Sequence, residues 1–87
     1  MDLSVLDDPE RRVVGAKQTA KALTKGEVAL VFIAADADPK VIKPLEQKCQ
    51  EQKVKLLKVS SMNQLGTACS IQVGAAVAAL LKEPKNN

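Results

Sequence analysis

The sequence is almost free of aromatic side chains: Phe32 is its only aromatic residue, and Tyr and Trp are absent. Histidine, the commonest general base near neutral pH, is missing as well. The hydroxyl and thiol side chains have no obvious partner to activate them as nucleophiles, and no glycine-rich nucleotide-binding motif occurs. We therefore expect neither an enzyme nor a cofactor. Because proteins that bind single strands stack bases on aromatic rings, any RNA bound here must be recognised by its folded shape.

Metal ligands and cysteines are also scarce. Cys49 and Cys69 lie twenty residues apart, outside any CxxC motif, and no histidine could complete a zinc site. We expect both thiols to be reduced and buried. Asp36 and Asp38 are too few ligands for a hard-metal cage, so we expect no bound metal. Capping of a following helix explains Asp38 more simply.

No apolar stretch is long and uninterrupted enough to span a membrane, and the N-terminus begins with acidic residues rather than with a signal pattern. We therefore expect a cytoplasmic, monomeric protein that does not contact membranes. A length of 87 residues predicts one domain, residues 1–87, with a single modest core. With so few aromatic residues, that core must be built from Val, Leu, Ile and Ala.

The charge is modest overall, at +3, but it is unevenly distributed. Between residues 11 and 25 there are five cations and no acid, namely Arg11, Arg12, Lys17, Lys21 and Lys25. A local basic face on a small domain suggests a polyanionic partner. On charge alone, a helix face that is merely solvated is an equal alternative.

Strand and helix patterns alternate along the chain. Strands are expected at residues 11–15, 28–35, 54–59 and 76–81, and helices from residue 16, from residue 39 and over residues 62–69. The run at 28–35 is almost continuously apolar, which is typical of an inner strand covered on both faces. The alternation predicts an α/β fold with a mixed, mainly parallel four-stranded sheet and helices on both faces. The tail, residues 82–87, is expected to be loose.

The helix ends carry local signals. Gly15 suits the N-cap of the first helix, and Gly26 suits the position just after its end. In this helix Lys17, Gln18 and Lys21 are expected together near the N-terminal end, facing outward.

Asp38 can cap the second helix, which begins at Pro39, and the inner Pro44 must either kink that helix or divide it in two. Ser61 with Gln64 forms a capping-box pattern for the third helix.

Three segments, GAKQTAKALTKG, IAADADP and LGTACSIQVGAA, occur in an order and spacing that resemble a known family. The chain resembles the kink-turn-binding ribosomal proteins of the L7Ae and L30e type, in their short bacterial branch, over residues 13–81. The resemblance implies a three-layer α-β-α sandwich. It also implies a ligand, the RNA kink-turn, which is a sharply bent duplex whose core consists of tandem sheared G·A pairs.

The resemblance further implies a set of RNA-binding residues. Gly15 and Lys21 match the helix motif of the family, while Lys17 and Gln18 stand where archaeal and eukaryotic relatives have Asn and Glu. Lys and Gln side chains can bond guanine edges in the major groove. Gly15 would let the backbone approach the RNA closely, and the helix N-terminus favours phosphate.

Two more regions match family positions that contact the kink. Asp38 matches a residue that touches a looped-out nucleotide, and Met62 stands where eukaryotic relatives often have a lysine. The loop that lies against the bulge is matched by residues 70–74, of which Ile71, Gln72, Val73 and Gly74 are the expected RNA-binding residues. Without the resemblance, the alternation of Ile71 and Val73 favours strand residues that face the core, and Met62 could be a gap-filling side chain.

The sequence therefore predicts a non-enzymatic RNA-binding protein that recognises and stabilises kink-turns in structured RNA, either ribosomal or regulatory. The alternative is a protein-binding scaffold of the same fold whose lysines only aid solubility.

Overall fold

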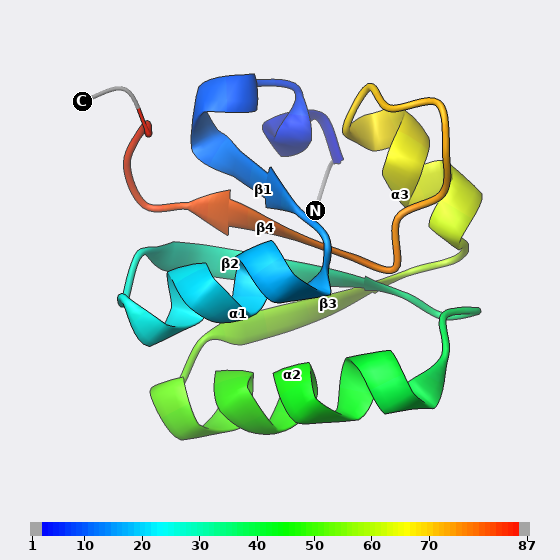
Figure 1. Cartoon of the computed structure of the whole chain (residues 1–87). Helices are drawn as coiled ribbons and strands as arrows, with labels where there is room; N and C mark the ends of the chain where they lie inside the picture. Colours follow the sequence, from blue (N-terminus) through cyan, green and yellow to red (C-terminus); the bar gives the residue numbers. More distant parts are fainter. Residues whose placement is uncertain (1–2, 86–87) are drawn as a thin grey trace.

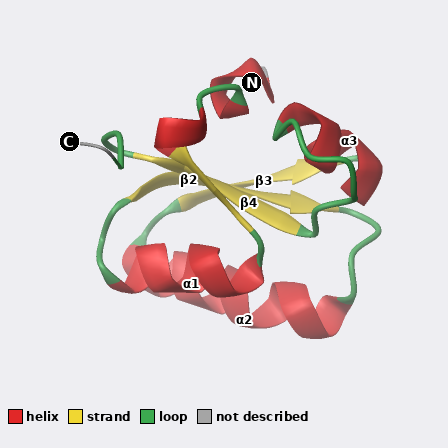
Figure 2. Cartoon of the chain, turned by 45° about the horizontal axis from the view of Figure 1, so that its top comes forward, coloured by secondary structure: helices red, strands yellow, loops and turns green. Residues whose placement is uncertain are grey.

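The computed structural model describes residues 3–85, and within them the chain forms three layers (Figure 1). The strands are β1 (Arg12–Val14), β2 (Val28–Ala34), β3 (Lys55–Val59) and β4 (Val77–Leu81). The helices are α1 (Ala16–Thr24), α2 (Pro39–Gln52) and α3 (Met62–Ala68), preceded by 3-10 turns at Leu3–Leu6 and Pro9–Arg11. Helices α1 and α2 cover one face of the sheet, while α3 and the N-terminal turns cover the other (Figure 2). The predicted α-β-α sandwich is confirmed.

The four strands form one mixed sheet in the order β1-β4-β2-β3. Strands β2 and β3 are parallel, whereas β4 runs antiparallel to both of its neighbours. The expected mixed sheet is therefore present, but the expectation that it is mainly parallel is wrong. Helix α3 has seven residues, about 10 Å of helix, and stays at the end of the sheet where β3 finishes. The chain consequently enters β4 from that end and runs back.

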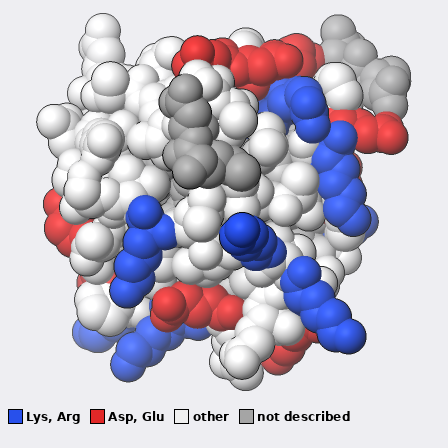
Figure 3. Space-filling view, turned by 180° about the vertical axis from the view of Figure 1, so that it is seen from behind, with Lys and Arg blue, Asp and Glu red and all other residues white. Residues whose placement is uncertain are grey.

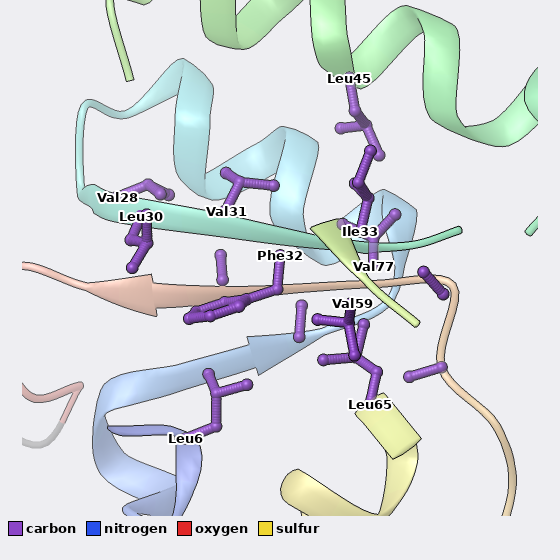
Figure 4. Close-up of a cluster of buried hydrophobic side chains, with 14 of the residues drawn as sticks. Leu6, Val28, Leu30, Val31, Phe32, Ile33, Leu45, Val59, Leu65 and Val77 are labelled. Atoms are coloured by element: carbon purple, nitrogen blue, oxygen red, sulfur yellow. The ribbon is translucent and has the colours of Figure 1, made fainter. Parts of the chain in front are cut away.

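The core is centred on β2, whose side chains are buried on both faces as the apolar run predicts. Ile33 points toward Leu45 of α2, and Phe32 lies on the opposite face of the strand, toward Leu6 (Figure 4). Phe32 is only 1% exposed and is the largest fully buried side chain. The described helices include none that is long and apolar enough to cross a membrane.

Both cysteines are free and buried, as expected. Burial raises the pKa of the Cys49 thiol, and the nearby Glu46 carboxylate raises it further. Burial also raises the pKa of the Cys69 thiol, although the positive charge of Arg12 opposes this shift. Both side chains therefore favour the neutral thiol, which is the less reactive form.

The predicted side-chain caps of α2 and α3 are formed. The carboxylate of Asp38 accepts a hydrogen bond from the Lys40 N–H at 2.9 Å. The Ser61 hydroxyl accepts one from the Gln64 N–H at 3.0 Å, but the Gln64 side chain bonds to Ser60 and does not complete the capping box. Helix α2 runs through Pro44 without interruption, so the alternative of two separate helices is wrong.

Two of the five cations in the basic segment fasten the fold together. The Arg11 guanidinium donates to the carbonyl oxygens of Leu81 and Lys82, at 3.0 and 3.2 Å. That of Arg12 donates to the carbonyl oxygen of Leu6 at 2.7 Å. The other three cations of this segment, Lys17 and Lys21 in α1 and Lys25 at its C-cap, are exposed.

The chain after β4 is held by backbone hydrogen bonds. The N–H of Lys82 donates to the Glu27 carbonyl at 2.8 Å, and that of Lys85 donates to the Glu10 carbonyl at 2.6 Å. The expectation of a loose tail is therefore wrong for residues 82–85, and residues 86–87 lie outside the described part of the chain.

Candidate nucleic-acid interface

The start of α1, the start of α2, and α3 with the loop that follows it lie at one end of the sheet, on the right in Figure 1. The carboxyl ends of β1, β2 and β3 meet there, and β4 begins beside them because it runs in the opposite direction. The Gly15 N–H donates to the Val77 carbonyl at 2.8 Å, and the Ala34 N–H donates to the Ala76 carbonyl at 2.9 Å. In open α/β sheets, this end of the strands is where ligands bind.

The start of α1 is shaped by Gly15. Its φ of 99° and ψ of 154° fall in a region that is essentially restricted to glycine. A Cβ at this position would meet no atom within 4 Å, so the space above the residue is open. The Gly15 carbonyl accepts the Thr19 N–H at 3.0 Å and begins the helix. Because glycine has no side chain to cap the first turn, the helix N-terminus is left available to an anionic group.

Lys17, Gln18 and Lys21 are all exposed, as predicted. They do not all line the same hollow, however. Gln18 and Lys21 line a groove of about 500 Å³ between α1 and residues 81–85. Lys17 lines a second hollow of about 410 Å³ between α1 and α2. The three side chains are therefore divided between two sides of α1.

The loop after α3 folds back onto the helix that precedes it. Ser70 has a φ of 60°, its N–H donates to the Thr67 carbonyl at 3.0 Å, and the Ile71 N–H donates to the Gly66 carbonyl at 3.1 Å. This pair of bonds is the Schellman motif, which reverses the chain at the end of a helix. A Cβ on Gly66 would lie 2.2 Å from the Val73 carbonyl oxygen, so the loop approaches α3 as closely as glycine allows.

Met62 joins this loop to the segment after β2 through its backbone. The Met62 N–H donates to Asp36 Oδ1 at 2.7 Å, and the Met62 carbonyl accepts the Ala75 N–H at 2.9 Å. Its side chain is half-buried against the core, and its Cβ lies 3.1 Å from where a Cβ on Gly74 would stand. These contacts fit the gap-filling alternative for Met62. The sequence did not reveal the role of Asp36, since nothing local connects it to a residue 26 positions later.

Ile71 and Val73 have different surroundings. Ile71 is half-buried and packs against the core, so the core-facing alternative holds for it in part. Val73 is 72% exposed and is the only large apolar side chain, among those the structure describes, that is this open to solvent. The core-facing alternative is wrong for Val73. Its neighbours Gln72 and Gly74 are exposed as well.

The arrangement offers hydrogen-bond donors, ammonium groups and one exposed apolar loop. Asp38 caps α2, as predicted, and it remains exposed at the same end of the sheet. Within residues 3–85, no three His, Cys, Asp or Glu side chains gather in a way that could hold a metal ion. On the face opposite to that seen in Figure 1, basic side chains are spread out and interspersed with acidic ones (Figure 3).

Comparisons with known proteins agree with this description. The model of the ribosomal protein L7Ae/L30e/S12e/Gadd45 family matches residues 2–87. An RNA-binding protein of Caldanaerobacter subterraneus subsp. tengcongensis is 48% identical over 82% of this chain and 87% of its own length. The RNA-binding protein YbxF of Geobacillus stearothermophilus is 47% identical over 80% of this chain and 85% of its own. The 15.5 kD RNA binding protein of Giardia lamblia has a TM-score of 0.86 at 32% identity, covering 93% of this chain and 71% of that one.

Proposed function

Because the chain belongs to the ribosomal protein L7Ae/L30e/S12e/Gadd45 family, as its motifs indicated, we propose that it binds RNA and that the motif it recognises is the kink-turn. The family and the curated relatives named RNA-binding proteins indicate a protein without enzymatic activity. The kink-turn itself is proposed from the resemblance of the three sequence motifs and from the chemistry of the site.

One observation carries the proposal: the open N-terminus of α1 and the exposed Val73 loop lie at the same end of the sheet. A sheared G·A pair leaves its guanine edge open in the major groove. Gln18 and Lys21 have donors for O6 and N7 of such a guanine, and Gly15 leaves the approach unobstructed. Val73 offers an apolar contact for the bases at the kink bulge, and phosphates can bind the N–H groups at the start of α1.

The first experiment compares two duplexes. One contains a kink-turn, and the other has the same sequence with its G·A pairs changed to Watson–Crick pairs. We expect tight binding to the first and weak binding to the second in a gel-shift titration. Equal affinities would contradict kink-turn recognition. A protein that binds neither duplex, and recovers no structured RNA from lysate, would instead be the scaffold of the alternative hypothesis.

Gln18 provides a sharper test. Its amide can accept from guanine N1–H and donate to O6, whereas a glutamate at this position could accept from N1–H and the exocyclic amine. We expect Gln18→Glu to bind within about tenfold of the parent, about 1.4 kcal/mol. Gln18→Ala should lose about 1–3 kcal/mol, because a guanine edge is left unpaired in a closed interface.

Both variants are titrated against one kink-turn at fixed salt, beside a control variant, Lys58→Ala. Lys58 is exposed on β3, at the sheet edge opposite to β1. If Gln18→Ala binds like the parent and like this control, Gln18 does not read the RNA.

A further inference from the structure

The groove beside α1 extends well beyond the residues that the proposed function uses. It is lined by α1, by Val13 of β1 and by the segment after β4. Gln18 and Lys21 stand on its wall. Its other charged residues are Lys25, Lys82 and Lys85, together with Glu27 and Glu83. Four ammonium groups therefore face two carboxylates along one continuous hollow.

The fold holds both walls of this groove in place. On one side, Lys21 and Lys25 are separated by one helical turn, which sets their Cβ atoms about 5–6 Å apart. On the other side, the backbone N–H groups of Lys82 and Lys85 are bonded to carbonyls of earlier segments. The Arg11 guanidinium also donates hydrogen bonds to the carbonyl oxygens of Leu81 and Lys82. The lysines of the second wall therefore stand on an anchored backbone.

We propose that this groove binds the phosphate backbone of an RNA stem next to the kink. The inference rests on the proposed function, because Gln18 and Lys21 belong both to the base-reading cluster and to the groove. An RNA held by these two residues would continue past Lys25 and between the lysines of the second wall. Such contacts set the position of the RNA on the protein and add affinity without reading sequence.

The residues that line the groove favour contacts with RNA phosphates over contacts with RNA bases. None of its lining residues is aromatic, since Phe32 is buried in the core. Bases of a single strand would have no ring to stack on. The ammonium groups of lysine are point charges suited to phosphate oxygens. A duplex stem, which presents phosphates and keeps its bases paired, is the nucleic acid that these side chains match.

The test compares two double variants that remove the same charge. Lys82→Ala/Lys85→Ala removes cations from the groove, and Lys55→Ala/Lys58→Ala removes exposed cations from β3 at the opposite sheet edge. On a kink-turn with long stems, we expect the groove variant to bind about 3- to 10-fold more weakly than the parent. Its salt-dependence slope should also fall by about two. The β3 variant should change affinity less than twofold. Equal effects of the two variants, or no effect of either, would overturn the proposal.

A second variant changes the groove in the opposite direction. Glu27→Gln removes a carboxylate from the lining and leaves the Glu27 backbone bonds intact. We expect it to bind the long-stem RNA about twofold more tightly, a gain that misfolding cannot produce. Unchanged or weaker binding would argue against phosphates in this groove.

The RNA series separates the two hypotheses. If the parent binds a kink-turn and its Watson–Crick counterpart equally, kink-turn recognition fails. The difference between the double variants on either duplex still tests the groove. If the parent prefers the kink-turn but both double variants bind like the parent, only the groove proposal fails. A parent that binds no RNA overturns both.

Discussion

Gly15 shapes the start of α1 and belongs to the proposed RNA site. Residues other than glycine avoid its backbone conformation, which would cost them about 1–3 kcal/mol of strain. The space around a Cβ at this position is open. We predict that Gly15→Ala destabilises the protein by about this amount through backbone strain, because an added methyl group meets no neighbour. The measurement is chemical denaturation, followed by RNA titration of the folded variant.

Gly26 is the matched control for this prediction. Its φ of 71° is in the ordinary left-handed region, and a Cβ there would also meet open space. Gly26→Ala should cost about 1–2 kcal/mol of folding stability, because the left-handed backbone is less strained than that of Gly15. If Gly15→Ala proved less costly than Gly26→Ala, the strain assigned to the start of α1 would be wrong.

Single residues also show what the sequence could predict. The caps at Asp38 and Ser61 were predictable because each side chain lies within a few residues of the N–H group that it accepts from. Arg11 bonds carbonyl oxygens about 70 residues away, and Asp36 bonds the first N–H of α3. Such partners become neighbours only when the chain folds. From the charge pattern alone, Arg11 was therefore predicted to belong to the basic face, although its guanidinium bonds backbone carbonyls.

At the scale of elements, α3 and its following loop form one unit that depends on Gly66. In an exposed helix, Gly→Ala stabilises by about 1 kcal/mol. Here the new Cβ would lie 2.2 Å from a backbone carbonyl oxygen, which cannot rotate away. We predict that Gly66→Ala destabilises the protein by about 1–3 kcal/mol and weakens RNA binding, because residues 71–74 must shift.

Chemical denaturation and RNA titration check this outcome beside Asn63→Ala, an exposed position on the same helix. The control should change stability by no more than about 0.5 kcal/mol. A Gly66→Ala variant that gained stability would show that the loop is not held against α3 as described.

Variants in the loop after α3 should affect RNA affinity and folding stability differently. Val73 is largely exposed, so Val73→Ala should change the free energy of unfolding by less than about 0.5 kcal/mol. If the side chain packs against a nucleotide, affinity should fall by about 1–2 kcal/mol, at about 0.8 kcal/mol for each buried CH₂. Ile71→Ala removes a half-buried side chain and should lower both quantities. Parental affinity of Val73→Ala would remove the loop from the interface.

The direction of β4 was the element-scale error of the sequence prediction. Periodicity identified the strands and helices, and the β1-α1-β2 and β2-α2-β3 connections do return the chain to parallel strands. Nothing in the local pattern indicates that α3 stays at one end of the sheet, where the Schellman turn at Ser70 sends the chain back. That reversal leaves the loop after α3 at the same end of the sheet as the start of α1, where the proposed site lies (Figure 1).

At the scale of the whole molecule, the described residues pack around one aliphatic core, and a chain of this length has limited stability. At about 0.05–0.15 kcal/mol per residue, 87 residues give roughly 4–13 kcal/mol. Phe32, at the centre of the middle layer, is the largest side chain in that core. Truncating such a residue to alanine typically costs about 3–5 kcal/mol, whereas a change to leucine costs less than about 1.5 kcal/mol.

This limited stability allows fold and function to be tested together. We predict that Phe32→Ala leaves a measurable unfolded fraction, and that kink-turn RNA restores folding. A ligand at about 100 times its Kd adds about 2.7 kcal/mol to the stability of the state that binds it. The folded fraction is measured by brief proteolysis, since the chain has no Trp or Tyr to report unfolding by fluorescence. Phe32→Leu serves as the folded control, and the Watson–Crick duplex serves as the control RNA. Because Phe32 lies far inside the core and cannot touch RNA, rescue by the kink-turn alone would mean that recognition requires the assembled sheet end. Equal rescue by both duplexes would mean that only general charge attraction is at work.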